Sequence, residues 1–426
     1  MIDINLVREN IDLVKAGVAK KKYDTLVVDR VAKTDREHVA LLQKVEDLRH
    51  ERNVISKEYT PENVARGKEI KSELAKLEPD LEKLEVEVNG LLQSIPNLPQ
   101  EGIPDGEGEE DNKVLREWGV PKEFNFTPKD HLELGKELDI LDFDSGAKIA
   151  GSGFYYLKND GALLEIALVS YGMKFLAERG FIPMLTPDVA RERFYLGTGY
   201  LPKGDEAQTY VLEGTDLGLI ATAEVTLAGY HADEILNEKD LPKKYAGYSH
   251  CFRREDGAYG KYSKGLYRVH QFTKVEMFAY AKPEESKKVH EEFLKTEEEF
   301  WQSLGIPYRV LEMCTGDLGA QAARKIDLEA WMPGRAAQVG RASPERRGDY
   351  GEVTSTSNTT DYQARNLNIR YRRGDRTEYV HTLNGTLFAS SRCPLAIIEN
   401  YQQEDGSILI PEVLRPFMGK EKIISK

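Results

Sequence analysis

Two neighbouring segments near the N-terminus carry mostly apolar residues at alternating spacings of four and three, which is the heptad pattern of a coiled coil. The repeat positions are Leu41, Val45, Leu48, Arg52, Ile55 and Tyr59 in the first segment, and Ile70, Leu74, Leu77, Leu81, Leu84, Val88, Leu91 and Ile95 in the second. Between the segments, Thr60 can cap a helix and Pro61 can occupy its first turn. The sequence therefore predicts an antiparallel helical hairpin over about residues 28–95, which at ~1.5 Å per residue is roughly 45 to 50 Å long.

The remainder of the chain has the pattern of one unit of mixed structure. The second helix ends near Ile95, and the glycine- and acid-rich stretch 101–112 is typical of a linker. Helical patterns at 162–179 and 283–304 mix with short alternating strands at 208–212 and 274–280, without a regular β-α-β cadence. We therefore expect an α+β fold, an antiparallel sheet flanked by helices, with an N-terminal domain over 1–110 and a second domain over 111–426.

Charge and cysteine content narrow the function classes. The formal net charge of -13 disfavours non-specific binding of the whole chain to nucleic acid, so an RNA partner would need a local patch. Cys251, Cys314 and Cys393 show no C-x-x-C spacing, so we expect neither a zinc site nor a disulfide framework. Asp3 and Arg8 interrupt any N-terminal apolar segment, and no run approaches the ~18 residues of a membrane span. We expect a cytoplasmic chain that does not contact a membrane.

A candidate ligand site lies within residues 251–278. The chain has no G-x-x-x-x-G-K-[ST] loop, but C-F-R-R-E-D-G and G-L-Y-R-V-H-Q-F-T-K-V-E-M-F predict two antiparallel strands joined by a mobile, basic, glycine-containing loop. Because side chains on a strand alternate between faces, the second strand is expected to present on one face Arg268, His270, Phe272, Lys274, Glu276 and Phe278. A half-buried strand with so many ionisable groups indicates a bound ligand rather than a solvated sheet face.

These strands resemble motif 2 of class II aminoacyl-tRNA synthetases, whose core pattern is F-R-x-E, and their residues are similar to those of the seryl-tRNA synthetase family. Further stretches agree with that family: T-A-E at 222–224, E-V-T-S with S-N and D-Y-Q-A-R within 352–365, and L-N-G-T at 383–386 followed by Arg392 and I-E-N-Y, which resembles motif 3. Motif 1 corresponds to the helix ending near Arg179, the strand through Phe181 and the proline at Pro187. The hairpin resembles the family's tRNA-binding arm, so the likeness runs nearly end to end.

The resemblance implies a serine–tRNA ligase that activates L-serine with ATP and Mg²⁺. It implies that Arg253 and Arg392 are catalytic, Arg253 bridging the serine carboxylate and the α-phosphate and Arg392 holding the γ-phosphate. The implied ATP-binding residues are Arg253, Glu255, Arg268, Val269, Phe272, Glu352, Ser355 and Arg392, with Glu352 and Ser355 as the Mg²⁺ ligands. The implied serine-binding residues are Thr222, Glu224, Arg253, Glu276, Asn384 and Thr386.

The resemblance also implies the macromolecular partners. The arm would bind tRNA(Ser), and tRNA(Sec) would be charged with serine for the same reason, while the chain would form a homodimer through motif 1. Candidate phosphate contacts on the arm are Arg49, Arg52, Lys57, Arg66, Lys68, Lys71 and Lys76.

Two other functions stay open from the sequence. A synthetase-like paralogue that loads another acceptor would be expected to lack the long arm, and a non-catalytic coiled-coil adaptor would be expected to lack one of the key arginines. This chain carries the arm pattern and both Arg253 and Arg392.

Overall fold

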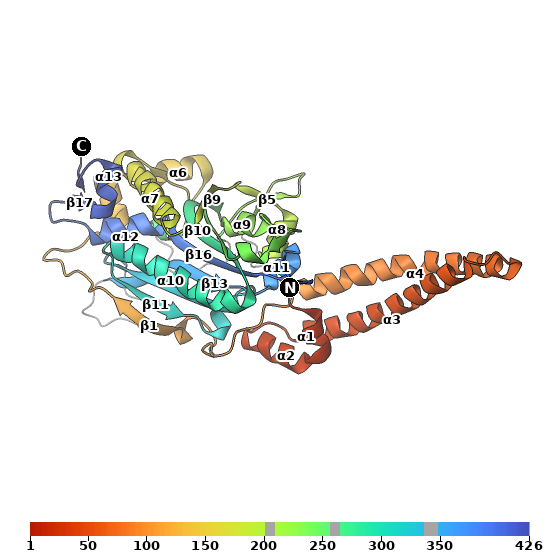
Figure 1. Ribbon diagram of the computed structural model, residues 1–426. Coiled ribbons are helices and arrows are strands. Elements are labelled where there is room, and N and C mark those ends of the chain that lie inside the picture. Colours follow the sequence, from red (N-terminus) through yellow and green to blue (C-terminus); the bar gives the residue numbers. More distant parts are fainter. Residues whose placement is uncertain (201–208, 256–264, 336–347, 426) are drawn as a thin grey trace. The chain divides into compact units, whose positions relative to one another are not determined.

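The structure, a computed structural model, describes residues 1–200, 209–255, 265–335 and 348–425 (Figure 1). These residues divide into two units, Met1–Leu98 and Pro99–Lys426. The sequence-based boundary at residue 110 lies twelve residues further along, because the intervening segment bonds to the second unit: the backbone N–H of Gln100 donates to Ala323 O at 2.9 Å. Where the functional domains divide stays a prediction.

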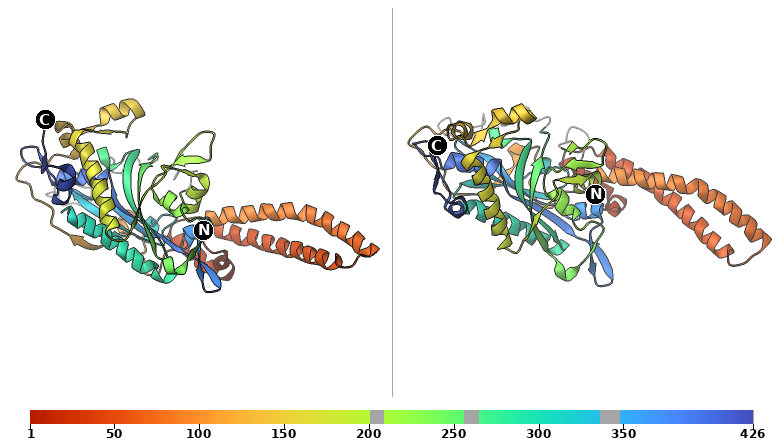
Figure 2. Two further views of the ribbon diagram at one scale, coloured as in Figure 1. Left: turned by 45° about the horizontal axis from the view of Figure 1, so that its top comes forward. Right: turned by 90° about the horizontal axis from the view of Figure 1, so that it is seen from above.

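The first unit is helical, as the heptad pattern predicts. Its helices are α1 (Ile4–Glu9), α2 (Ile11–Lys20), α3 (Leu26–Ile55) and α4 (Pro61–Gln93). Thr60 caps α4, its Oγ1 accepting from the backbone N–H of Asn63 at 3.1 Å, and Pro61 is the first helical residue. Figures 1 and 2 show α3 and α4 side by side as an antiparallel hairpin. The predicted hairpin, its cap and its turn are confirmed.

The apolar positions of α3 and α4 pack against one another only along part of the predicted repeat. Val45, Leu48, Ile70 and Leu74 form a buried cluster, and the repeat ends at the half-buried Ile55. Tyr59, expected to continue the repeat, is instead 95% exposed, because α3 ends at Ile55 and the chain has already turned away from the helix–helix contact. The loop that joins the helices, residues 56–60, is therefore polar apart from the Tyr59 ring.

An eight-stranded sheet organises the second unit. Its strand order is β1-β11-β12-β13-β16-β10-β9-β4, and every neighbouring pair is antiparallel except β4 with β9. The strands are β1 (Lys113–Trp118), β11 (Tyr308–Glu312), β12 (Arg324–Met332), β13 (Asp349–Asn358), β16 (His381–Ala389), β10 (Gln271–Ala281), β9 (Lys243–Phe252) and β4 (Ile182–Leu185). The expected α+β fold with a largely antiparallel sheet is confirmed.

Helices and smaller sheets surround this main sheet (Figure 2). The helices are α5 (His131–Glu137), α6 (Phe143–Ala150), α7 (Asn159–Ala177), α8 (Glu192–Thr198), α9 (Glu224–Gly229), α10 (Ser286–Ser303), α11 (Tyr362–Leu367), α12 (Arg392–Asn400) and α13 (Arg415–Met418). The short strands are β2 (Leu141–Asp142), β3 (Tyr156–Leu157), β5 (Val189–Arg191), β6 (Tyr210–Val211), β7 (Leu217–Leu219), β8 (Ile235–Asn237), β14 (Arg370–Arg373), β15 (Arg376–Tyr379), β17 (Ile408–Leu409) and β18 (Lys422–Ile423). In the part of the chain that the structure describes, no helix is long and apolar enough to span a bilayer.

Strand alternation separates the core from the site. On β13, Thr354 and Thr356 donate to the carboxylate of Glu297 on α10, whereas Ser355 lines a cavity on the other side of the sheet. Burial raises the pKa of Glu297 well above its usual value. Phe300 and Trp301, on α10 itself, belong to the apolar core between this helix and the sheet.

Candidate active site

A cavity of about 330 Å³ opens on the face of the sheet opposite α10. The cavity brings together twelve of the thirteen residues that the sequence assigned to a site, namely Glu224, Arg253, Glu255, Arg268, Val269, Phe272, Glu276, Glu352, Ser355, Asn384, Thr386 and Arg392. Thr222 is not among the lining residues. It is fully buried, and its Oγ1 accepts from the backbone N–H of Glu224 at 3.1 Å, so it supports the start of α9.

The two predicted strands are present, but the second begins later than expected. Residues 265–267 form a single 3-10 turn, and β10 starts at Gln271, so Arg268 and His270 precede the strand. The backbone N–H of His270 donates to Gly153 O at 3.1 Å, outside the sheet, and its ring stacks on Phe154. His270 therefore points away from the cavity, whereas Arg268 still lines it. The connecting loop, 256–264, lies outside the described residues.

Arg392, the first residue of α12, is held at one end of the cavity by three oxygens. Its Nη1 lies 3.0 Å from both the carboxylate Oε1 and the backbone carbonyl of Glu352, and its Nε donates to Tyr267 O at 3.3 Å. The guanidinium also packs on the Tyr267 ring, 4.6 Å from the centroid. Although burial alone would lower the pKa of Arg392, the Glu352 carboxylate and the Tyr267 oxygen raise it, so this side chain is always charged.

Arg253 and Arg268 extend the positive charge along the cavity. Arg253 follows directly after β9, and its guanidinium lies 5.3 Å from the centroid of the Phe272 ring. Its Nε donates to Ala221 O at 3.4 Å. Arg268 forms an ion pair with Glu255 at 2.6 Å. Three guanidinium groups from three chain segments thus converge on one cavity, an arrangement suited to a polyanion such as a triphosphate.

A buried carboxylate, Glu224, marks the other end of the cavity. It accepts from Tyr200 Oη at 2.9 Å, Gln363 Nε2 at 2.7 Å and Asn384 Nδ2 at 2.9 Å. Burial, together with the negative charge of Glu276, raises the pKa of Glu224 to about 7. A carboxyl poised to ionise near neutral pH suits a cationic ligand group, such as the ammonium of an amino acid.

Glu276 lies beside Glu224 and is fixed by neighbours on two strands. Lys274 forms a close ion pair with Glu276 along β10, and Thr386 on β16 donates to Glu276 Oε2 at 3.3 Å. Lys274 Nζ also donates to Thr386 Oγ1 at 3.3 Å. This end of the cavity therefore offers several fixed hydrogen-bonding groups to a small polar ligand, rather than apolar volume.

Glu352 and Ser355 face the same cavity only because β13 is irregular. Three residues apart, they would point to opposite faces of a regular strand, but one extra residue, Val353, shifts the register with β12. Although burial would raise it, the pKa of Glu352 is lowered by the positive charges of Arg392, Lys325 and Arg253. An ionised carboxylate and a hydroxyl on one face supply two hard oxygen ligands of the kind that Mg²⁺ takes.

The surroundings of Glu352 and Ser355 fit such an ion. Asp327, opposite Ser355 on β12, has a buried Oδ1 without a hydrogen-bond partner. Among the described ranges, no group of three or more His, Cys, Asp or Glu forms a complete metal cage. A Mg²⁺ held by one or two protein oxygens, substrate phosphates and water does not need one.

Several lining or supporting residues were not assigned from the sequence. Lys274 could have been assigned to the site from the sequence, because it shares the strand face of Phe272 and Glu276, but it was not included. Tyr200, Gln363 and Lys325 come from segments distant in the sequence and contact the site residues only in the folded chain. Of these three residues, only Gln363 lies within a stretch that the family resemblance singled out.

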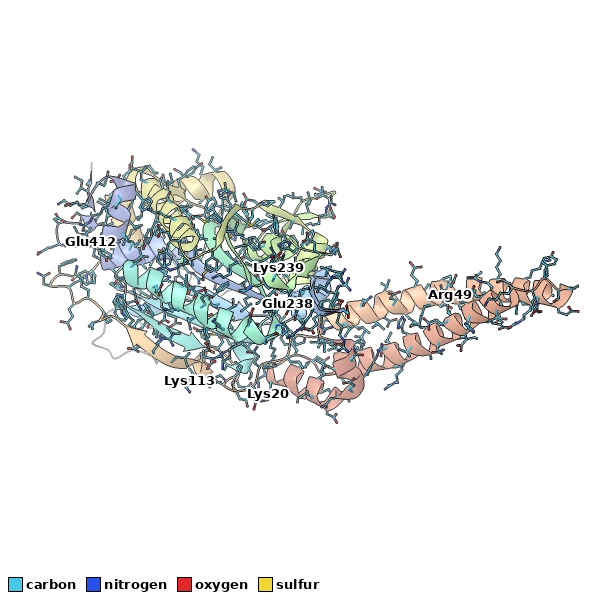
Figure 3. All side chains as sticks on the ribbon, in the orientation of Figure 1. Lys20, Arg49, Lys113, Glu238, Lys239 and Glu412 are labelled. Carbon is cyan, nitrogen blue, oxygen red and sulfur yellow. The ribbon has the colours of Figure 1, made fainter. Side chains whose placement is uncertain are left out.

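On the arm, the candidate RNA contacts divide into two groups. Arg49, labelled in Figure 3, pairs with Glu78 at 2.8 Å, and Arg66 pairs with Glu51 at 2.7 Å, so both link α3 to α4. The other candidates are exposed, and within the described residues they form no cross-helix ion pair: Arg52, Lys57, Lys68, Lys71 and Lys76.

Two family models match the chain. The model described as seryl-tRNA synthetase N-terminal domain matches residues 1–99, and the model described as tRNA synthetase class II core domain (G, H, P, S and T) matches residues 210–401. The chain is 49% identical to the serine–tRNA ligase of Dictyoglomus turgidum, with 100% of both chains covered.

Solved structures agree along the whole chain. The seryl-tRNA synthetase of Pyrococcus horikoshii complexed with ATP is similar with a TM-score of 0.90 and 41% identity, covering 100% of both chains. The cytoplasmic serine–tRNA ligase of Naegleria fowleri in complex with AMP is similar with a TM-score of 0.87 and 34% identity, covering 100% of this chain and 99% of that one.

Proposed function

The chain belongs to the seryl-tRNA synthetase family of class II aminoacyl-tRNA synthetases, and we propose that the residues of the cavity carry out serine activation in the roles given below. The enzyme joins serine to tRNA at the expense of ATP. What supports the residue roles is a single observation: three arginines, an ionised carboxylate and a hydrogen-bonding pocket line one cavity.

The activation step needs charge neutralisation more than proton transfer. The serine carboxylate is already ionised at neutral pH, and it attacks the α-phosphate of ATP while pyrophosphate leaves. Arg253 neutralises the carboxylate and the α-phosphate as they meet, and Arg392 and Arg268 bind the outer phosphates. Mg²⁺, when bound by Glu352 and Ser355, supplies further neutralisation of the phosphate charge.

Adenine and serine are matched to two positions on β10, one near its start and one at its middle. Phe272 stacks on the purine, near the backbone of Val269, and Glu255 accepts from the adenine amino group. Four residues along the same strand, or ~13 Å at ~3.3 Å per residue, Glu276 contacts serine together with Glu224, Asn384 and Thr386. Ribose and α-phosphate can bridge this span.

A serine-dependent exchange assay tests the function. Each of the twenty amino acids is offered with ATP and labelled pyrophosphate, and we expect exchange with serine alone, because a pocket built to bind a hydroxyl leaves polar groups unpaired with alanine. Exchange with a different amino acid, or with none, would contradict the assignment and favour the paralogue or the adaptor.

The tRNA partners and the domain roles form a further part of the proposal. Residues 1–110 form the tRNA-binding domain and 111–426 the catalytic domain, and the exposed basic residues of the arm contact phosphates of tRNA(Ser) and tRNA(Sec). Charging of both transcripts with serine is the test, and failure with tRNA(Sec) alone would restrict the enzyme to tRNA(Ser).

Homodimerisation through motif 1 completes the proposal, with the cytoplasm as the expected location. Apolar side chains on α7 and β4 support it, since Leu163, Ile166, Ile182 and Leu185 are 47%, 61%, 52% and 80% exposed. Leu163 and Ile166 lie one helix turn apart on α7, and exposed apolar area of this kind, together with that of the edge strand β4, is typical of a surface covered by another chain. The molar mass in solution tests it, and a monomer at micromolar concentration would contradict it.

A further inference from the structure

His131 and Glu399 form a fully buried pair that does not line the cavity. His131 is the first residue of α5, and Glu399 lies near the end of α12; both side chains are 0% exposed. His131 Nδ1 lies 2.8 Å from Glu399 Oε1. The carboxylate also accepts from the backbone N–H groups of His131 at 3.1 Å and Gly334 at 2.8 Å.

The hydrogen bonds fix the protonation of the His131 ring. Nδ1 faces a carboxylate and carries the proton, while Nε2 accepts from the backbone N–H of Leu266 at 3.1 Å. A second proton on the ring would set one N–H against another. The ring approaches closely because residue 265 is glycine: a Cβ there would lie 2.2 Å from Nε2, and φ is +59°.

The pair closes a ring of contacts that includes Arg392. Leu266 belongs to the turn Gly265–Tyr267, and the Tyr267 carbonyl and ring both hold the Arg392 guanidinium. Arg392 and Glu399 are seven residues apart on α12, and therefore on the same helix face. The circuit runs from Arg392 along α12 to Glu399, through His131 to Leu266, and through Tyr267 back to Arg392.

We propose that His131 and Glu399 are positioning residues, which hold the Tyr267–Arg268 segment and Arg392 at the spacing needed to bind the ATP phosphates. The inference rests on the phosphate-binding roles of Arg392 and Arg268 proposed above. Arg392 is anchored to the Tyr267 backbone, so a shift of that turn displaces two guanidinium groups together. The serine end of the cavity is built on β10, β16 and α9, and within the described residues the side chains of the pair form no hydrogen bond with these elements.

Four variants separate positioning from simple packing. His131→Asn keeps a donor toward Glu399 but removes the acceptor for Leu266, whereas His131→Gln places an amide oxygen near the Nε2 position. Glu399→Gln replaces one acceptor oxygen by an NH₂ group that opposes an N–H. The matched control is Gln402→Ala. Gln402 lies just after α12, and its side chain bonds to Lys129 N and O, just before α5, at 2.8 and 3.0 Å and to the Glu399 backbone O at 2.8 Å, but not to the Glu399 carboxylate, Leu266 or Gly334.

Serine-dependent ATP–pyrophosphate exchange is measured on the full chain with ATP and serine varied separately. We expect the KM for ATP to rise about tenfold in His131→Asn and Glu399→Gln, because a buried N–H loses its acceptor. The KM for serine should stay within about twofold, and His131→Gln should restore most of the ATP affinity. Gln402→Ala should match the wild type, and thermal unfolding monitors folding of each variant.

Three results would overturn the inference. The first is an unchanged KM for ATP in folded His131→Asn and Glu399→Gln. The second is an equal loss for serine and ATP, or an equal loss in Gln402→Ala. The third is failure of both His131→Asn and Glu399→Gln to fold, which would assign the pair a purely structural role. Absence of exchange in the wild type would instead refute the proposed activity, so the two failures are distinguishable.

Discussion

Replacing Arg392 by alanine separates catalysis from stability. The substitution removes the ion pair with Glu352 and two hydrogen bonds to backbone carbonyls. Loss of one partner of an enclosed ion pair costs about 3–5 kcal/mol, but the Glu352 side chain is 44% exposed to the cavity, where water can solvate it. We therefore expect the free energy of unfolding to fall by only about 1–2 kcal/mol.

The expected loss of activity is much larger. Removing one preorganised charge that stabilises a developing anion typically costs about 10²–10³-fold in rate. A protein with a stability of about 5–15 kcal/mol stays folded after a loss of about 1–2 kcal/mol, so unfolding does not explain such a drop. Arg392→Lys keeps the charge without the planar fork, and we expect about a tenfold loss.

The assay is serine-dependent ATP–pyrophosphate exchange combined with thermal unfolding. The matched control is Arg324→Ala, which breaks the pair with Glu312 at 2.7 Å on the same sheet but outside the cavity lining. The control should lose stability and keep its exchange rate. The reasoning is refuted if Arg392→Ala exchanges within about threefold of the wild type, or no more slowly than Arg324→Ala.

Three further predictions concern the arm and the serine pocket. Replacing residues 36–89 by a short glycine linker, which keeps the Arg8–Asp35 pair, should leave ATP–pyrophosphate exchange largely intact and abolish tRNA charging. Thr60→Ala should cost the arm about 1 kcal/mol, measured by hydrogen exchange, because α4 loses its cap, whereas Thr60→Ser should not. Since the pKa of Glu224 is raised to about 7, the KM for serine should fall about tenfold from pH 6 to 8 as this carboxylate ionises, and Glu224→Gln should flatten the profile.

Each of these predictions has a contrary outcome. If the shortened chain charges tRNA as fast as the wild type, the arm does not bind tRNA. If Thr60→Ala and Thr60→Ser show equal protection from hydrogen exchange, the Thr60 cap does not stabilise α4. The pKa of Glu224 is higher in the folded chain than in the unfolded chain. Its protonated carboxyl therefore adds to the free energy of unfolding below about pH 4.5, and this contribution is lost as the pH rises toward 7. The difference in unfolding free energy between wild type and Glu224→Gln should follow that window, and a pH-independent difference would contradict it.

The fold was predictable wherever the pattern is local. Heptad spacing and the Thr60-Pro61 pair specify the hairpin, because capping and helix–helix packing depend on residues a few positions apart. Two local patterns were wrong at their ends: Tyr59, expected to continue the heptad repeat, is exposed, and Arg268 and His270, expected on a strand, precede β10. In both places a turn in the chain overrides the periodicity.

The sequence alone predicted the long helical arm from its heptad spacing and the charged strand face from its alternation, and the family resemblance singled out the arginines and carboxylates of the candidate site. Only the tertiary structure decided which of them face one another. The extra residue at Val353 turns Glu352 and Ser355 to one side of β13, and no count of alternating positions reveals it. The contact of His131 with Glu399 joins positions 268 residues apart. Periodicity is a property of neighbouring residues, whereas strand register and long-range contacts are set when distant segments pack together.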